Sequence, residues 1–123
     1  MLGKKKKELN VINDQFSSPT YASDLAGIII EIISNKNFQT KVRLTEIYHY
    51  SSKGEVSWYE FAKEIFELGG IDHPIRSIST KQYPSIAQRP KNTLMNKDKI
   101  VKVFNIQVPY WKTSLNSCIR LFL

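Results

Sequence analysis

The segment from Asp24 to Ser34, with the sequence DLAGIIIEIIS, limits most strongly what this chain can fold into. Eleven residues with such a run of apolar side chains favour a helix over a strand. Thr20 or Ser23 is expected to cap the N-terminus of this helix. Because its apolar residues lie almost all round the axis, the helix is expected to be covered on more than one side.

The composition is close to the average of soluble globular domains. The chain has 123 residues, of which 41% are hydrophobic and 24% charged, which fits one domain with a core. No stretch reaches the roughly 18 apolar residues that a membrane span requires, so no membrane partner is expected. The single Cys118 excludes an internal disulfide and is typical of a reducing compartment. A cytoplasmic location is therefore expected.

The net charge of +7 favours an anionic partner, such as nucleic acid, a phosphorylated small molecule or a membrane surface. Lys4 to Lys7 carry four of the positive charges, and such a run is typical of a solvated tail or helix end. The remaining basic residues are scattered through the sequence. They form no basic stripe of the kind that nucleic-acid binding requires, so nucleic acid is not the expected partner.

The order of predicted elements is typical of an α/β protein. Ser57 and Glu60 have the spacing of a capping box, and the apolar residues behind them recur at helical spacing up to Gly69 and Gly70. The elements expected along the chain are a strand at 9–12, the helix at 24–34, a strand around 46–50, the capped helix from 58, a strand at 75–80, a loop at 83–93, a short helix at 96–104 and a last helix from Pro109.

A polar segment, NDQFSSPTYASDLA, joins the first predicted strand to the apolar helix. Polar side chains at the C-terminal end of a strand lie where ligands bind in open α/β sheets. The same residues would also serve as an extended helix-capping loop, in which Thr20, Ser23 and Asp24 bond to backbone groups. Both interpretations of the segment stay open.

A second polar segment runs from Gln88 to Thr93 and contains an arginine that is followed by a proline. The guanidinium of Arg89 offers two parallel donors, which suit a phosphate group. The alternative is an arginine that is only solvated on a loop.

Several classes of site are not indicated. The chain has no glycine-rich phosphate-binding motif, so no dinucleotide cradle is predicted. His49 and His73 lie far apart and only one cysteine is present, so no metal site is predicted. Tyr59 and Lys63 have the spacing of a reductase Tyr-x-x-x-Lys pair, but Tyr59 falls in the first turn of a capped surface helix. No catalytic residue is therefore predicted.

The motifs together resemble the C-terminal half of the dTDP-4-dehydrorhamnose reductases, a family of extended short-chain dehydrogenases. The resemblance covers nearly the whole chain and keeps the family's order of motifs. In this sequence the matching segments are residues 14–21 with 24–26, residues 54–62, residues 89–93 with Lys99, and residues 109–111. Ser17 stands where the family usually has glycine, which would strain a backbone that needs a positive φ.

The resemblance implies an α/β fold that forms the C-terminal portion of a Rossmann-like protein. It consists of the last sheet strands and a small, mostly helical substrate-binding subdomain. Residues 1–123 would then be a single partial domain. The family's NADPH-binding motif and its catalytic Tyr-x-x-x-Lys lie upstream of the matched part. No cofactor is therefore expected for this chain alone, and NADPH belongs to the full-length family.

The family reduces dTDP-4-dehydro-L-rhamnose to dTDP-L-rhamnose with NADPH. The resemblance implies a dTDP-sugar ligand that contacts Gln15 as an amide donor, Phe16 as an apolar wall and Thr20 through its hydroxyl. Arg89 would bind the diphosphate, and Asn92 would support its loop. The expected protein partners are a second copy in a homodimer or the missing N-terminal half. The alternative is a non-catalytic interaction or regulatory module of the same fold, because relatives of these reductases include regulatory subunits.

Overall fold

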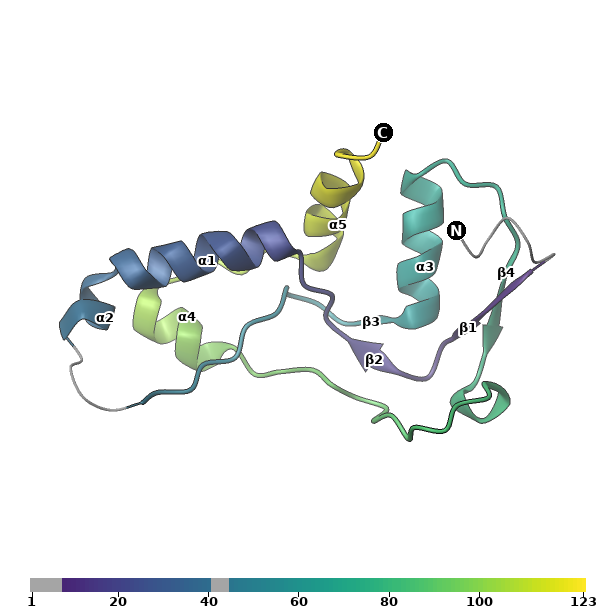
Figure 1. Ribbon diagram of the computed structural model, residues 1–123, viewed down its shortest axis with the longest axis horizontal. Coiled ribbons are helices and arrows are strands. Elements are labelled where there is room, and N and C mark those ends of the chain that lie inside the picture. Colours follow the sequence, from purple (N-terminus) through teal and green to yellow (C-terminus); the bar gives the residue numbers. More distant parts are fainter. Residues whose placement is uncertain (1–7, 41–44) are drawn as a thin grey trace.

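The computed structural model of the protein describes residues 8–40 and 45–123. Its elements, in chain order, are β1 (Leu9–Ile12), β2 (Phe16–Ser17), α1 (Ala22–Ser34), α2 (Lys36–Thr40), β3 (Val56–Ser57), α3 (Trp58–Leu68), β4 (Ile75–Ile78), the 3-10 helix η1 (Thr80–Gln82), α4 (Asp98–Phe104) and α5 (Trp111–Ile119). The molecule is elongated. Figure 1 shows β1, β4 and α3 at one end and α1, α2 and α4 at the other.

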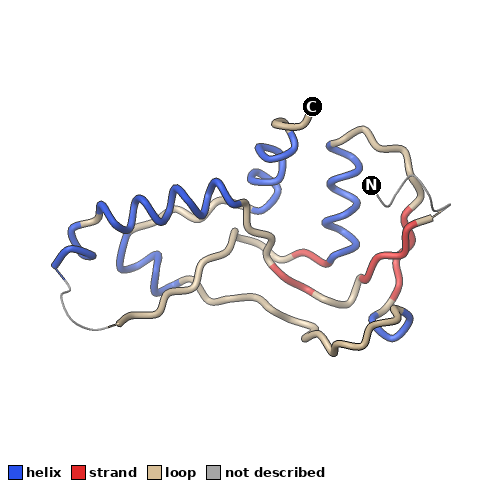
Figure 2. The backbone as a smooth tube through the Cα atoms, viewed as in Figure 1, coloured by secondary structure: helices blue, strands red, loops and turns tan. Residues whose placement is uncertain are grey.

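The strands β1 and β4 pair in parallel along their whole length, from Leu9 opposite Ile75 to Ile12 opposite Ile78. The strands predicted at 9–12 and 75–80 are confirmed, although the second ends at Ile78. The short strands β2 and β3 form a separate antiparallel pair (Figure 2). Parallel strands end at the same edge of their sheet, so the residues that follow Ile12 and Ile78 lie side by side.

The helix α3 begins with the capping box predicted from the sequence. Ser57 Oγ accepts a hydrogen bond of 3.2 Å from the Glu60 amide, and Glu60 Oε2 accepts one of 3.1 Å from the Ser57 amide. Two backbone donors that the helix leaves unpaired are thereby satisfied. The helix ends at Leu68, directly before Gly69, as predicted.

Two clusters of buried apolar side chains hold the elements together. The buried members are Ile28, Ile100, Phe104 and Ile106 in the first cluster, and Val56, Trp111 and Leu115 in the second. The first cluster joins α1 to α4, and the second joins β3 and α5 to α3. In the second cluster the ring of Phe61 packs edge-on against Trp111, with 5.9 Å between the ring centroids.

The apolar helix is present as α1, but its predicted cap is wrong. The N-cap residue is Tyr21, which forms no capping hydrogen bond through its side chain. Because the helix begins at Ala22, Ser23 already lies inside it and Thr20 lies one residue too early.

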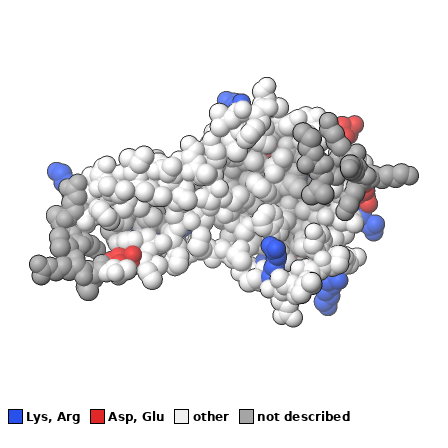
Figure 3. All heavy atoms as spheres, viewed as in Figure 1, with Lys and Arg blue, Asp and Glu red and all other residues white. Residues whose placement is uncertain are grey.

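The cover expected for α1 is also only partly formed by the described residues. Ile28 is buried against α4, whereas Ile29, Ile30 and Ile33 are exposed. The end of the molecule that contains α1 accordingly shows a broad uncharged surface in Figure 3. One face of this helix is therefore packed and another is not.

The strand predicted around 46–50 is wrong. The segment is extended but has no ladder partner, and Tyr48 and Tyr50 pack instead against the first cluster. Lys99 covers this segment: its Nζ lies 4.7 Å from the centroid of the Tyr48 ring and donates a 2.9 Å hydrogen bond to the carbonyl of Ile47. Alternating apolar residues show that one side of a segment is buried, and here a helix buries it.

The serine at position 17 causes no backbone strain. Ser17 belongs to β2, and among the described non-glycine residues only Asn105 has a positive φ, of 57°. The loop accommodates serine without the conformation that would require glycine.

We expect Gly54→Ala to destabilise the chain by about 2 kcal/mol or more, because Gly54 has a φ of +97° and a Cβ there would lie 2.8 Å from Trp111 Cδ1. Gly27 is the matched control, because a Cβ at that helical position meets nothing within 4 Å. Gly27→Ala is expected to stabilise the chain by roughly 0.5–1 kcal/mol. Urea unfolding of the two variants measures both, and equal effects would contradict the close approach at Gly54.

Candidate functional site

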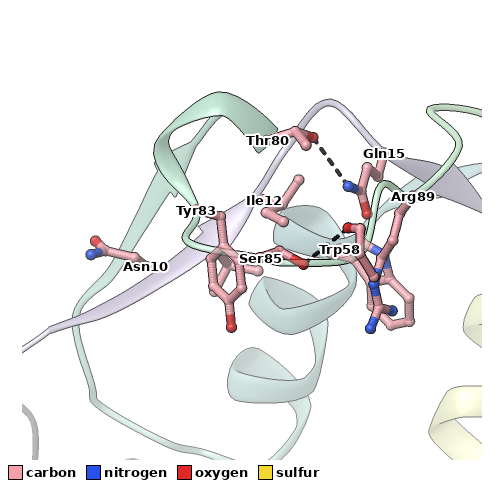
Figure 4. A pocket seen from close by; sticks show the side chains of 10 residues that line it. Asn10, Ile12, Gln15, Trp58, Thr80, Tyr83, Ser85 and Arg89 are labelled. Carbon is pink, nitrogen blue, oxygen red and sulfur yellow. Dashed lines mark hydrogen bonds between the residues drawn. The ribbon is translucent and has the colours of Figure 1, made fainter.

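A cavity of about 350 Å³ lies where β1 and β4 end. Its size is within the range of small-molecule sites. The residues that line it are Asn10, Val11, Ile12, Gln15, Trp58, Thr80, Tyr83, Ser85, Ala87 and Arg89. They come from β1, from the turn after it, from the first turn of α3 and from the loop after β4 (Figure 4). The position agrees with the rule that open α/β sheets bind ligands at the carboxyl ends of their strands.

Three polar side chains connect the ends of the two strands. Asp14 Oδ1 accepts hydrogen bonds from the Thr80 amide at 2.8 Å and from the Thr80 hydroxyl at 2.6 Å. Gln15 Nε2 in turn donates to Thr80 Oγ1 at 3.1 Å. Gln15 is only 5% exposed, so this bond satisfies one donor of an amide that is nearly buried.

The same contacts keep Asp14 ionised. The hydrogen bond from the Thr80 hydroxyl lowers the pKa of Asp14 below its ordinary value of 3.8, and the Thr80 amide and the positive charge of Lys91 act in the same direction. Partial burial opposes this shift. The Lys91 ammonium lies 3.9 Å from Asp14 Oδ2 and is itself well exposed, so its contribution is screened by solvent.

The loop that carries Arg89 is held against β2 by backbone hydrogen bonds. The Phe16 amide donates to the carbonyl of Lys91 at 2.8 Å, and the Thr93 amide donates to the carbonyl of Phe16 at 3.0 Å. Asn92 Oδ1 accepts a 2.9 Å hydrogen bond from the Leu94 amide. These bonds place the guanidinium of Arg89 at the cavity, on the exposed side of the loop.

Eight of the ten cavity residues are missing from the sequence-based prediction, and Trp58 and Thr80 are the two that matter most for the site. Trp58 has the spacing of an apolar core residue of α3, yet its side chain is 46% exposed and lines the cavity. Trp58 directly follows the N-cap Ser57, and this position is the signal that could have identified it. A side chain in the first turn of a helix lies at the helix end, where it can extend past the residues that pack against the core. Thr80 could have been found from the pairing of β1 with β4, which brings it next to Gln15.

The structure brings together two of the five predicted site residues. Gln15 and Arg89 both line the cavity. Phe16 does not, because successive side chains of an extended segment point to opposite sides and its neighbour Gln15 occupies the cavity side. Thr20 is exposed beyond β2, next to the start of α1, and Asn92 bonds within its own loop, so neither lines the cavity.

Other polar residues of the segment NDQFSSPTYASDLA form hydrogen bonds within the fold. Asp24 Oδ2 accepts a hydrogen bond from the Ser114 hydroxyl, and the Ser18 hydroxyl donates to the carbonyl of Gly54. In residues 8–40 and 45–123 no three histidine, cysteine or acidic side chains are grouped to hold a metal ion. None of the helices in the same ranges has the length and hydrophobicity needed to cross a lipid bilayer.

Comparison with known proteins identifies the family. The sequence model of the RmlD substrate binding domain matches residues 1–123. The chain belongs to this family. A dTDP-4-dehydrorhamnose reductase of Sinorhizobium fredii is 36% identical over 111 residues, which is 87% of this chain and 38% of the relative. The spore coat polysaccharide biosynthesis protein SpsK of Bacillus subtilis is 33% identical over 119 residues, which is 97% of this chain and 39% of the relative.

Solved structures of the same kind confirm the predicted fold. A dTDP-4-dehydrorhamnose reductase from Clostridium acetobutylicum superposes with a TM-score of 0.83 at 35% identity, over 98% of this chain and 41% of its own. The reductase of Bacillus anthracis, solved in complex with NADP, gives a TM-score of 0.80 at 31% identity, over 99% of this chain and 40% of its own. This RmlD-family chain thus spans about two fifths of the length of these relatives.

The described residues do not fit the cofactor of the Bacillus anthracis structure. A dinucleotide is bound through its pyrophosphate by a glycine-rich turn that opens a helix. In this chain Gly54 is packed against the rings of Tyr110 and Trp111, Gly27 lies inside α1, and Gly69 and Gly70 follow the end of α3. None of these glycines forms a glycine-rich turn whose backbone amides, together with the start of a helix, could bind a pyrophosphate.

The carboxylate of Asp14 generates a prediction about pH. Its pKa is lowered in the folded state, so the ionised group stabilises the fold above its unfolded-state value of 3.8, and this contribution is lost as pH falls through the folded value. Asp14→Asn is therefore expected to lower the urea midpoint at neutral pH and to match the parent chain at pH well below 3.8.

The companion variant Lys91→Ala is expected to change the midpoint less than Asp14→Asn, because the Thr80 bond is the larger cause of the shift. A difference between Asp14→Asn and the parent chain that stays constant from neutral pH to strongly acidic pH would contradict this account of Asp14.

Proposed function

We propose that this chain is the substrate-binding portion of a dTDP-4-dehydrorhamnose reductase and that its cavity binds a dTDP-sugar. The observation that carries the proposal is the juxtaposition of Gln15, Trp58 and Arg89 at the carboxyl ends of β1 and β4. A flat aromatic surface, a nearly buried amide and a free guanidinium are the groups that a nucleotide-sugar requires.

The diphosphate would lie at Arg89. Its guanidinium presents parallel N–H donors, and Pro90 stiffens the backbone directly after it. The loop is anchored to β2 on both sides of Asn92, so the cation is held near the cavity. The net charge of +7 would attract a doubly charged nucleotide from solution.

The reaction proposed for the complete protein is the reduction of dTDP-4-dehydro-L-rhamnose to dTDP-L-rhamnose with NADPH. In this assignment residues 1–123 are one partial domain, and the cofactor is bound by another part of the protein. The exposed apolar face of α1, which includes Ile29, Ile30 and Ile33, supports this assignment, since apolar surface of that kind is normally covered by a neighbour. Contact with an N-terminal portion or with a second copy would cover it.

Arg89→Ala is expected to weaken binding of dTDP-rhamnose by about 1.5–3 kcal/mol, because a charged hydrogen bond to the diphosphate is lost. Isothermal titration calorimetry of the 123-residue chain measures this change. Arg76→Ala is the matched control, because it removes the same charge from an exposed position on β4 outside the cavity. Equal affinities of the Arg89→Ala and parent chains would remove Arg89 from the site.

The chain alone is expected to leave NADPH unoxidised when supplied with dTDP-4-dehydro-L-rhamnose, because its described residues form no dinucleotide cradle. The loss of NADPH absorbance measures turnover, and a full-length reductase of the family is the positive control. Turnover by the chain alone would contradict the proposal that another part of the protein binds the cofactor. A folded chain that binds no dTDP-rhamnose would contradict the binding proposal and favour the interaction module.

A further inference from the structure

We propose that Asp14 and Thr80 are positioning residues that orient the amide of Gln15, so that its carbonyl oxygen faces the cavity and accepts a hydrogen bond from the ligand. The cavity would then select a ligand with an N–H or O–H donor at this point. This inference rests on the proposed function, and it adds the polarity that the cavity imposes on its ligand.

The carboxylate of Asp14 fixes the direction of the hydrogen bond that it shares with the Thr80 hydroxyl. An ionised carboxylate accepts hydrogen bonds and donates none. Asp14 Oδ1 lies 2.6 Å from Thr80 Oγ1, so the single hydroxyl proton of Thr80 must point toward Asp14. The backbone amide of Thr80, at 2.8 Å from the same oxygen, keeps the carboxylate in this position.

The Thr80 hydroxyl in turn fixes the orientation of the Gln15 amide. A hydroxyl that already donates its one hydrogen bond to Asp14 can only accept hydrogen bonds from its other neighbours. Gln15 therefore meets Thr80 Oγ1 with its NH2 group, at 3.1 Å. If the Gln15 amide were flipped, two oxygens would face each other at that distance with no proton between them. Asp14 thus sets the orientation of Gln15 through Thr80.

The carbonyl oxygen of Gln15 lies at the end of the amide that does not bond to Thr80. Figure 4 shows the carbonyl oxygen of Gln15 turned away from Thr80, toward the part of the cavity that holds Trp58 and Arg89. In the described part of the chain no group donates a hydrogen bond to this oxygen. Gln15 as a residue is only 5% exposed, but this oxygen is not among the described buried polar atoms that lack a partner, so a donor on a ligand in the cavity can reach it.

The Gln15 carbonyl and the Arg89 guanidinium attract different groups of a ligand. Phosphate oxygens accept hydrogen bonds, so they would be repelled by the Gln15 carbonyl and attracted by the guanidinium of Arg89. The Ser85 hydroxyl already donates to the carbonyl of Ala87 at 3.0 Å and does not compete for the anion. A dTDP-sugar carries three kinds of donor that suit Gln15: the imide N–H of the thymine base, the 3′-hydroxyl of the deoxyribose and the hydroxyls of the attached sugar. Each of these groups presents a hydrogen-bond donor to the carbonyl oxygen of Gln15.

The orientation is tested first in the ligand-free chain. By NMR, one side-chain amide proton of Gln15 is expected to be protected from exchange with solvent, and Thr80→Val is expected to remove this protection. Thr80→Ser, which keeps the hydroxyl, is expected to retain it. An amide of Gln15 that exchanges equally fast in all three chains would overturn the inference, whatever the ligand proves to be.

Binding is tested by titration of dTDP-rhamnose in a double-mutant cycle. Thr80→Val and Gln15→Met are each expected to lower the affinity about tenfold, since each removes the oriented acceptor. The double variant is expected to bind no more weakly than Gln15→Met alone, because Thr80 acts through Gln15. Thr80→Ser restores binding, and Thr113→Val, an exposed threonine on α5, is the control. Additive losses would overturn the inference and show that Thr80 contacts the ligand itself.

Two further ligands distinguish the sources of the donor. If the imide N–H is the donor, dTDP methylated at N3 is expected to bind about tenfold more weakly than dTDP. If a rhamnose hydroxyl is the donor, dTDP and its N3-methyl form bind alike, and Gln15→Met affects dTDP-rhamnose but not dTDP. If the deoxyribose hydroxyl is the donor, dTDP and its N3-methyl form again bind alike, but Gln15→Met weakens both dTDP-rhamnose and dTDP. A parent chain that binds dTDP-rhamnose through Arg89 but is insensitive to Thr80→Val contradicts this inference alone. A chain that binds no dTDP-rhamnose contradicts the proposed function as well.

Discussion

The parallel pairing of β1 with β4 is the constraint on which the candidate site depends. These strands are separated by 62 residues of chain between Ile12 and Ile75, and β2, α1, α2, β3 and α3 occupy that interval. The pairing brings the turn after β1 against the start of η1, so that Asp14 and Thr80, 66 residues apart, share two hydrogen bonds. Without this register the nearly buried amide of Gln15 would lose its partner.

The cavity combines a fixed acceptor with a less constrained cation. Gln15 is held through Thr80 by a carboxylate, whereas Arg89 projects from an exposed loop that is anchored by backbone bonds to Phe16. Such an arrangement suits a ligand whose two ends differ in charge. The rigid end would determine which ligand group is accepted, and the cation at the other end would supply attraction to an anion. Trp58, at the start of α3, lines the same cavity and supplies its flat aromatic surface.

The two ends of the molecule differ in how completely they are packed. Around β3, α3 and α5 the apolar residues converge on Trp111 and Val56, which are 4% and 2% exposed. At the other end α4 buries Ile28 of α1, while Ile30 on the same helix remains 66% exposed. The exposed apolar face of α1 lies at the end of the molecule opposite to the cavity (Figure 1).

Local chemistry by itself determined several parts of this protein. The capping box at Ser57, the end of α3 at Gly69 and the apolar helix α1 follow from residues that are close in sequence, since capping and helical periodicity act within one or two turns. The motifs also indicated the family, the cavity segment around Gln15 and the loop of Arg89. Only the tertiary structure decided which of these side chains meet.

The predicted strand around 46–50 failed because a strand exists only beside another strand, and alternation cannot distinguish a covering helix from a sheet. Trp58 matched the apolar face of α3 but lies at the cavity, and Phe16 and Thr20 point elsewhere. The orientation of the Gln15 amide depends on Asp14 acting through a threonine on another strand end. Contacts between distant segments are set by register and packing, which no local pattern contains.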